Sequence, residues 1–357
     1  MHSDPLIKET LEPWMPSFLH DGIYYYDILL AAERMQSWDD WGSVWIENAF
    51  LHETLATKAR ESDRRISAVQ AFLTAARYYH MAYFIYTRDL EVHNKGLRKM
   101  LECYERVLDY LEPPVEKVTF PFEDTYLVGL FSNPFKDHLP PVVILIPGLD
   151  STKESRHRAC DRYLRRGMAV LSIDGPGQGE TSLRMSIRFD YEKVIAAAID
   201  YFEARGDVDI NRIRLMGSSL GGYYAPRAAA FETRVKACVG SCGPYDWSEC
   251  FGSVPHVTRE AYQLYSGAKS LKEVDELSKS MTLRGTAEQI TCPLLTIHGK
   301  RDALIPWEHG KRIVNEASGP KEFVLLEEGN HSLGNISYRS APVILDWLAE
   351  QIGGIVT

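Results

Sequence analysis

Gly217-Ser218-Ser219-Leu220-Gly221-Gly222 is the stretch of this 357-residue sequence that decides its fold. It follows the apolar run Ile213–Met216 and precedes a segment of helical pattern, which predicts a sharp turn from a strand into a helix. Small residues suit such a turn, because the backbone there leaves little room for side chains. The helix would offer N–H groups and its positive dipole end to an oxyanion. The stretch therefore predicts Ser219 as a nucleophile, the alternative being an ordinary serine in a glycine-rich turn.

Short apolar runs on both sides of this stretch alternate with segments of helical pattern. The runs are Val142–Ile146, Ala169–Ile173, Ile213–Met216, Val235–Val239, Leu294–Ile297 and Phe323–Leu326. The helical segments are 154–166, 189–205, 220–231, 306–317 and one near 341–352. Such alternation predicts an α/β fold, in which helices cover both faces of a mostly parallel sheet. Val115–Phe122 and Tyr126–Phe131 predict two paired strands ahead of it.

The sequence predicts two domains. Residues 8–112 have a helical pattern, clearest over Ser67–Tyr86 and Gly96–Leu111. Pro113-Pro114 ends it, because proline lacks the backbone donor and restricts the residue before it. We therefore expect a helical domain over 1–112 and an α/β domain over 113–357. Within the latter, 244–286 interrupt the alternation and predict an insertion over the carboxyl edge of the sheet, where ligands bind in such folds.

A serine nucleophile needs a base, and the base needs an acid that orients it. Asp302 follows the predicted strand Leu294–Ile297, and His331 follows Phe323–Leu326, so both lie at the same sheet edge as Ser219. Each has a structural alternative, a helix cap for Asp302 and a surface loop for His331. Three other ionisable residues near this edge are not expected to take part in catalysis. Glu327 and Glu328 are expected to be solvated, and His298 to be structural.

The second donor to an oxyanion is expected in the loop Pro147-Gly148-Leu149-Asp150-Ser151, after the first parallel strand. We assign the two donors to the backbone N–H groups of Leu149 and Leu220. Asp174-Gly175-Pro176-Gly177-Gln178-Gly179 is also glycine-rich, but it lacks the spacing and the ending of a phosphate loop. It predicts a tight turn.

Composition excludes several classes of function. The net charge of -9 disfavours a nucleic-acid binder, and no apolar stretch approaches the ~20 residues that span a bilayer. Six cysteines show no metal-ligand spacing, so we expect free thiols and neither a metal nor a cofactor. The N-terminal residues lack the pattern of a secretory signal, which favours a cytoplasmic protein.

These motifs together resemble the α/β-hydrolase superfamily over about residues 115–355. Three segments narrow the resemblance: Pro147–Glu154, Asp174–Glu180 and Gly217–Gly222. With the helical N-terminal domain, they resemble the group of dihydroxypseudooxynicotine hydrolase and the fungal polyketide-shortening hydrolases, which borders the esterase-like fermentation/respiration switch proteins. The resemblance implies a helical cap and cleavage of a carbon–carbon bond next to a ketone.

The resemblance also implies an additional glutamate in the active site, for which Glu249 is the nearest candidate; a surface glutamate is the alternative. Tyr79, His80 and Tyr83 are candidates to line a roof over an aromatic substrate, or they form a core between helices.

Three functions remain open at this stage. The first is a C–C hydrolase for an aromatic or polyketide-like ketone, the second a carboxylester hydrolase, and the third a regulatory protein without turnover. The expected partner is a small ketone or ester. If the helical domain did not cover the site it would serve dimerisation, so a homodimer is the candidate assembly.

Overall fold

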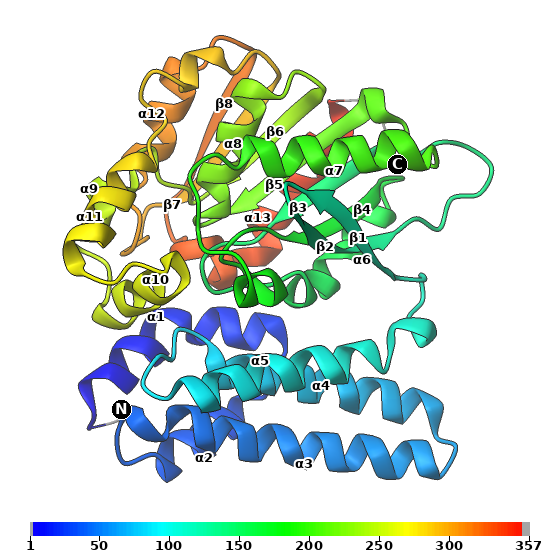
Figure 1. Cartoon of the computed structure of the whole chain (residues 1–357), viewed down its shortest axis with the longest axis vertical. Helices are drawn as coiled ribbons and strands as arrows, with labels where there is room; N and C mark the ends of the chain where they lie inside the picture. The colour runs from blue at the N-terminus through cyan, green and yellow to red at the C-terminus, as the bar shows by residue number, and fades with distance from the viewer. Residues whose placement is uncertain (1–2, 352–357) are drawn as a thin grey trace. The chain divides into compact units, whose positions relative to one another are not determined.

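The computed structural model describes residues 3–351, and their contacts divide into two compact units (Figure 1). The first is helical and comprises the described residues up to Val115 together with Pro255–Leu264. The second comprises Glu116–Val254 and the described residues from Tyr265 onward. The outer limits of the two expected domains, residues 1 and 357, lie outside the described residues.

The helical unit is built around α4. Its long helices are α1 (Pro5–Asp21), α2 (Tyr25–Arg34), α3 (Trp41–Glu61), α4 (Arg65–Tyr83) and α5 (Leu90–Glu105). The indole of Trp41 donates a hydrogen bond of 2.7 Å to the Met81 carbonyl, which ties α3 to α4. On the other side of α4, a Cβ atom at Gly96 of α5 would lie 3.1 Å from the Tyr79 carbonyl, so these helices pack at close range.

Two predicted helices in this unit have different bounds in the structure. The helix expected over Ser67–Tyr86 ends at Tyr83, because Phe84 leaves helical geometry and Ile85 has a φ of 45°. The helix expected over Gly96–Leu111 already begins at Leu90. The Asp89 carboxylate caps it by accepting hydrogen bonds from the N–H groups of Glu91 and Val92, a signal that the sequence reading missed.

The second unit contains one eight-stranded sheet. Its strands are β1 (Glu116–Phe122), β2 (Thr125–Ser132), β3 (Val142–Ile146), β4 (Ala169–Asp174), β5 (Ile213–Ser218), β6 (Val235–Ser241), β7 (Leu294–Gly299) and β8 (Lys321–Leu326). They lie in the order β1-β2-β4-β3-β5-β6-β7-β8. The β1–β2 and β2–β4 pairs are antiparallel, and all the later pairs are parallel. Every predicted strand is present, so the mostly parallel sheet is confirmed.

Helices cover both faces of this sheet (Figure 1). The helices are α6 (His157–Leu164), α7 (Glu192–Arg205), α8 (Gly221–Phe231), α12 (Glu308–Glu316) and α13 (Ser337–Glu350). The helices α6 and α13 share one core with β3 and β6, through residues such as Leu164, Val143 and Leu348. On the other face lie α7, α8 and α12. Apolar residues inside the strands are buried on both faces, as a two-sided parallel sheet requires.

The segment 244–286, all of which the structure describes, contains three helices and no strand of the sheet. They are α9 (Trp247–Phe251), α10 (His256–Ser266) and α11 (Leu271–Ser280). Most of α10 groups by its contacts with the N-terminal helices, for example through the ion pair of 3.1 Å between Glu260 and Arg88. The segment expected as one insertion is therefore shared between the two units.

Close packing at the turn between β5 and α8 predicts that one added methyl group at Gly221 destabilises the protein. A Cβ atom at Gly221 would lie 2.4 Å from the Ile146 carbonyl oxygen, a backbone atom that cannot move aside. We expect Gly221→Ala to lower the free energy of unfolding by about 1–3 kcal/mol, measured by urea denaturation. Gly252→Ala is the matched control, because a Cβ atom there meets nothing within 4 Å. Equal stability of the two variants would contradict the tight packing described here.

Candidate active site

Ser219 lies at the turn between β5 and α8, in the left-handed region of backbone conformation, with a φ of 58°. Its N–H group donates a hydrogen bond of 2.9 Å to the Ser241 carbonyl at the end of β6. Glycine is required on both sides. A Cβ atom at Gly217 would lie 1.8 Å from the Gly221 carbonyl oxygen, and one at Gly222 would lie 2.7 Å from the Cα atom of Gly243. The turn therefore holds the half-buried Ser219 side chain at the carboxyl edge of the sheet.

The structure brings Ser219, His331 and Asp302 together in one hydrogen-bonded chain. The Nε2 atom of His331 lies 2.8 Å from the Ser219 hydroxyl, and its Nδ1 atom lies 2.8 Å from the Asp302 carboxylate. A carboxylate only accepts hydrogen bonds, so Nδ1 carries the proton and Nε2 is left to accept the serine proton. The arrangement can thus move a proton from Ser219 to His331.

The surroundings of His331 and Asp302 favour this charge distribution. Burial alone would lower the pKa of His331, but the Asp302 carboxylate outweighs it and raises that pKa above its usual value. Burial alone would raise the pKa of Asp302, but His331 and the N–H groups of Leu304 and Ile305 hold it below its usual value. Asp302 therefore remains ionised beside the imidazole.

The loop that carries His331 has a brace that sequence reasoning missed. Asn335 accepts a hydrogen bond of 3.0 Å from the Asn330 N–H group and donates one of 2.7 Å to the Glu328 carbonyl. It spans a kink in which Ser332 and Leu333 both have positive φ values. A single asparagine late in a loop is a weak sequence signal, because many loops contain one without such a role.

The two other acids considered for this edge are paired elsewhere, and the histidine is buried. Glu327 pairs with Lys300 and Glu328 with Arg339, each at 2.7 Å on the exposed surface. His298 is fully buried in β7 against Gly310, and burial lowers its pKa to about 4.

The loop after β3 lies against Ser219 and brings a backbone N–H group near it. A Cβ atom at Gly148 would lie 3.0 Å from the Ser219 Cβ atom, so this loop contacts the serine directly. Leu149 and Leu220 follow Gly148 and Ser219 in the chain. Among the described residues, no hydrogen bond engages the N–H group of either leucine. Both N–H groups are therefore unengaged donors beside the serine.

Glu249 lies in α9, and two guanidinium groups hold its carboxylate. Arg312 donates a hydrogen bond of 2.6 Å to it, and Arg284 donates another. Its side chain is 36% exposed. These contacts are those of a surface ion-pair cluster, the alternative that the sequence left open.

The three aromatic candidates of the helical unit differ in their surroundings. The Tyr79 hydroxyl donates a hydrogen bond of 2.6 Å to Glu53, and the Tyr83 hydroxyl lies 3.4 Å from the Met100 sulfur. Both rings are buried between helices of this unit. His80 is half-buried and packs against the Tyr83 and Phe84 rings.

A buried cysteine near Asp302 raises the question of a thiol nucleophile. The Cys250 sulfur lies 3.4 Å from His309 Nε2, while His309 Nδ1 accepts a hydrogen bond from the Tyr245 N–H group. Nε2 therefore carries the proton and cannot act as a base toward the thiol. Burial also raises the pKa of Cys250 to about 12. This pair does not form an activated thiolate.

All six cysteines are free, and burial raises the pKa of each thiol. Among residues 3–351, no three His, Cys, Asp or Glu side chains gather where they could hold a metal ion. No helix in the described part of the chain is long and apolar enough to cross a membrane.

Comparisons with known proteins place this chain among hydrolases. One relative, 2,6-dihydropseudooxynicotine hydrolase of Paenarthrobacter nicotinovorans, is 28% identical over 92% of this chain and 89% of its own length. Another, 20-hydroxy-prefusarin hydrolase of Gibberella moniliformis, is 31% identical over 62% of this chain. The match spans only 57% of that fungal protein.

Solved structures extend the likeness to the fold. The crystal structure of 2,6-dihydroxy-pseudo-oxynicotine hydrolase superposes with a TM-score of 0.86 at 27% identity, covering 95% of both chains. AbyA5 shares the fold with a TM-score of 0.78 at 17% identity, covering 98% of this chain and 94% of its own. A family model described as FrsA-like esterase matches residues 30–259. This α/β-hydrolase is therefore an enzyme, and the chain belongs to the FrsA-like esterase family.

Proposed function

We propose that this enzyme hydrolyses a carbon–carbon bond next to a ketone, in an aromatic or polyketide-like substrate, through an acyl-enzyme on Ser219. The observation that carries the proposal is the hydrogen-bonded chain from Asp302 through His331 to Ser219, with both distances 2.8 Å. The relative named for a pseudooxynicotine substrate, which aligns with 92% of this chain, supports a ketone substrate.

In the first step His331 Nε2 removes the Ser219 proton while Ser219 Oγ bonds to the ketone carbon. The carbonyl oxygen becomes an oxyanion, which the N–H groups of Leu149 and Leu220 stabilise by hydrogen bonds. The ionised Asp302 stabilises the imidazolium that forms and keeps its ring oriented.

In the second step the oxyanion reforms a carbonyl and the carbon–carbon bond breaks. The departing carbon keeps the electron pair and takes the proton from His331. This carbon must carry an electron-withdrawing group, such as a second carbonyl, that delocalises the charge. Water, deprotonated by His331, then attacks the acyl-enzyme and releases a carboxylic acid. The sum is ketone plus water to give acid plus a C–H product.

A carboxylester hydrolase is the second candidate, and the name of the matching family favours it. The same three residues would act in the same order, with an alkoxide in place of the carbanion as the leaving group. An alkoxide is far easier to expel, so an ester substrate needs no electron sink. A regulatory protein without turnover is no longer a candidate, because the named relatives are hydrolases.

We also propose that residues 1–112 form a cap that supplies substrate contacts. An oxyanion interaction is stronger where water is excluded, so such a site needs a cover. The relative that aligns with 92% of this chain must share most of the helical unit as well. A cytoplasmic location and a homodimer stay predictions.

Ser219→Ala is expected to lower turnover on the order of a million-fold without unfolding the protein, because no other group can form the acyl-enzyme. Circular dichroism checks the fold. Ser218→Ala, a change at the adjacent serine, is the matched control and should retain most activity. A Ser219→Ala variant that keeps about a tenth of the wild-type rate would contradict the proposal.

The reaction type is tested with matched substrates. We expect wild-type enzyme to cleave an aryl 1,3-diketone into acid and methyl ketone. The analogue without the second carbonyl should react far more slowly, because its carbanion is not delocalised. Cleavage of the corresponding ester alone, with no diketone turnover, would establish the second candidate instead.

Asp302→Asn is expected to lower kcat by about 10⁴-fold, because the amide can donate to Nδ1 and leave Nε2 protonated. The pH dependence of kcat/KM tests the role of Asp302 independently. Catalysis needs neutral His331, so wild-type kcat/KM should fall as pH drops through a midpoint above the usual histidine value of 6.5. The variant lacks the carboxylate that raises this pKa, so its midpoint should move to lower pH. Glu327→Gln, which removes a rival acid, should leave rate and profile unchanged.

The cap proposal predicts an effect at His80, the half-buried member of the aromatic set. We expect His80→Ala to lower kcat/KM about tenfold, equivalent to roughly 1.4 kcal/mol of transition-state binding. Tyr79→Phe is the control, since it removes only a hydroxyl already bound to Glu53 and should affect stability alone. Wild-type kinetics for a folded His80→Ala variant would remove His80 from the substrate site.

A further inference from the structure

Gln178, in the glycine-rich loop after β4, uses every hydrogen-bonding direction of its buried carboxamide. Its Oε1 atom accepts hydrogen bonds of 2.9 Å from the Gly175 N–H group and from the Tyr191 hydroxyl. Its Nε2 atom donates to the carbonyls of Pro147, at 2.6 Å, and Gly148, at 3.1 Å. Rotating the amide by half a turn would set its NH₂ group against the Gly175 N–H group and its oxygen against the two carbonyl oxygens. Only one orientation therefore fits.

This orientation also fixes the direction of the Leu149 N–H group. The Gly148 carbonyl and the Leu149 N–H group belong to the same peptide unit, which is planar and trans, so they point in opposite directions. Because Gln178 holds the carbonyl, the N–H group must point away from Gln178. The same peptide lies beside the nucleophile, since a Cβ atom at Gly148 would be 3.4 Å from the Ser219 hydroxyl oxygen.

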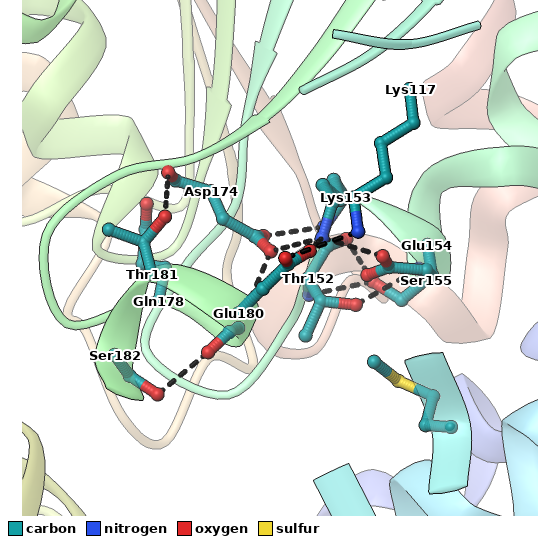
Figure 2. A network of polar contacts seen from close by, with 12 residues as sticks. Lys117, Thr152, Lys153, Glu154, Ser155, Asp174, Gln178, Glu180, Thr181 and Ser182 are labelled. Atoms are coloured by element: carbon teal, nitrogen blue, oxygen red, sulfur yellow. Dashed lines mark hydrogen bonds and ion pairs between the residues drawn. The ribbon is translucent and has the colours of Figure 1, made fainter. Parts of the chain in front are cut away.

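A buried lysine ties the far end of the same loop to the β4 loop (Figure 2). The backbone N–H group of Lys153 donates 2.8 Å to Asp174, the last residue of β4, and its ammonium donates 2.9 Å to the other oxygen of that carboxylate. The ammonium also contacts Glu154 at 2.7 Å and Glu180 at 3.0 Å. Leu149 therefore lies between two anchors, Gln178 and Lys153, that hold it to one neighbouring loop.

The carboxyl groups of this cluster keep the Lys153 ammonium charged. The Lys153 side chain is fully buried, and burial alone would lower its pKa, but the three carboxylates around it raise that pKa well above its usual value. Asp174 also accepts a hydrogen bond of 3.0 Å from the Glu180 N–H group, so it holds both loops at once. The loop that carries Gln178 is thereby fixed in place by a permanently charged residue.

We infer that Gln178 is the positioning residue of the oxyanion hole: it aligns the Gly148–Leu149 peptide so that the Leu149 N–H group meets the oxyanion formed at Ser219. The inference rests on the proposed acyl transfer at Ser219 and adds to it a residue that touches neither substrate nor nucleophile. The glycine-rich segment Asp174–Gly179 thus has a role beyond that of a turn.

The inference predicts a split between kcat and KM. The oxyanion exists only after Ser219 attacks, so a misaligned donor weakens the transition state and leaves the bound substrate unaffected. With 4-nitrophenyl acetate as the probe, we expect Gln178→Met to lower the acylation kcat about 10- to 100-fold while KM stays unchanged. This loss in kcat should be no larger than the loss caused by removing a whole oxyanion-hole donor. Gln289→Met is the matched control, because exposed Gln289 also donates to a backbone carbonyl, that of Gly285.

A carboxyl group at this position provides a second readout. Protonated glutamate can accept from Gly175 and Tyr191 and donate to one carbonyl, whereas ionised glutamate repels both carbonyls. Burial raises the pKa of a carboxyl group, so protonation falls within the working pH range. We expect the rate of Gln178→Glu, divided by the wild-type rate at the same pH, to rise as pH falls. The ratio cancels the titration of His331, and a merely structural role would leave it flat.

A transition-state analogue gives the third readout. A trifluoromethyl ketone forms a hemiketal on Ser219 whose oxyanion needs the Leu149 donor. Its affinity should fall in Gln178→Met by the same factor as kcat/KM, while Gln289→Met binds it like the wild type.

Two outcomes would overturn the inference: wild-type kcat and analogue affinity in folded Gln178→Met, or a flat rate ratio for Gln178→Glu. If Gln178→Met does not fold, the Gln178→Glu ratio decides alone. Activity that survives in Ser219→Ala would instead overturn the proposed function, so the two failures are distinguishable.

Discussion

The geometry of the site depends on the backbone-to-backbone packing around Ser219. The residue has a φ of 58°, a conformation that costs a non-glycine residue about 1–3 kcal/mol. Neighbouring loops impose it: Gly221 lies against the Ile146 carbonyl, and Gly222 against Gly243. Because these contacts involve main-chain atoms, side-chain motion cannot relax them. The strain is therefore the direct consequence of bringing the ends of β3, β5 and β6 together.

From that fixed point, each functional group comes from a different strand end and is held there by polar contacts, either within its own loop or from a neighbouring one. The β3 loop is held by Gln178 and Lys153, Asp302 by the N–H groups of Leu304 and Ile305, and the His331 loop by Asn335. Hydrogen bonds of this kind are directional, whereas apolar packing is not. The core gives the sheet its stability, and the braces give the edge its geometry.

Periodicity and chain order were enough to predict the sheet and the positions of Ser219, Asp302 and His331, because those features repeat along the sequence or follow strand ends. The braces could not be predicted in the same way. The four contacts of Gln178 depend on how two loops approach in space, and its segment indicated only a turn. Likewise, the sequence could not show that the Tyr79 hydroxyl is bound to Glu53 within the helical unit, since an aromatic stripe fits a roof and a core equally well.

The shielding of the six cysteines makes the chain well suited to selective chemical labelling. Maleimides and iodoacetamide react with thiolates, and every native thiol has a pKa raised by burial. A cysteine introduced at an exposed position, such as Ser62→Cys in the helical unit or Thr233→Cys in the sheet unit, would react first at neutral pH. Dyes at the two positions would report on the distance between the units during turnover by energy transfer, with all the native cysteines left in place.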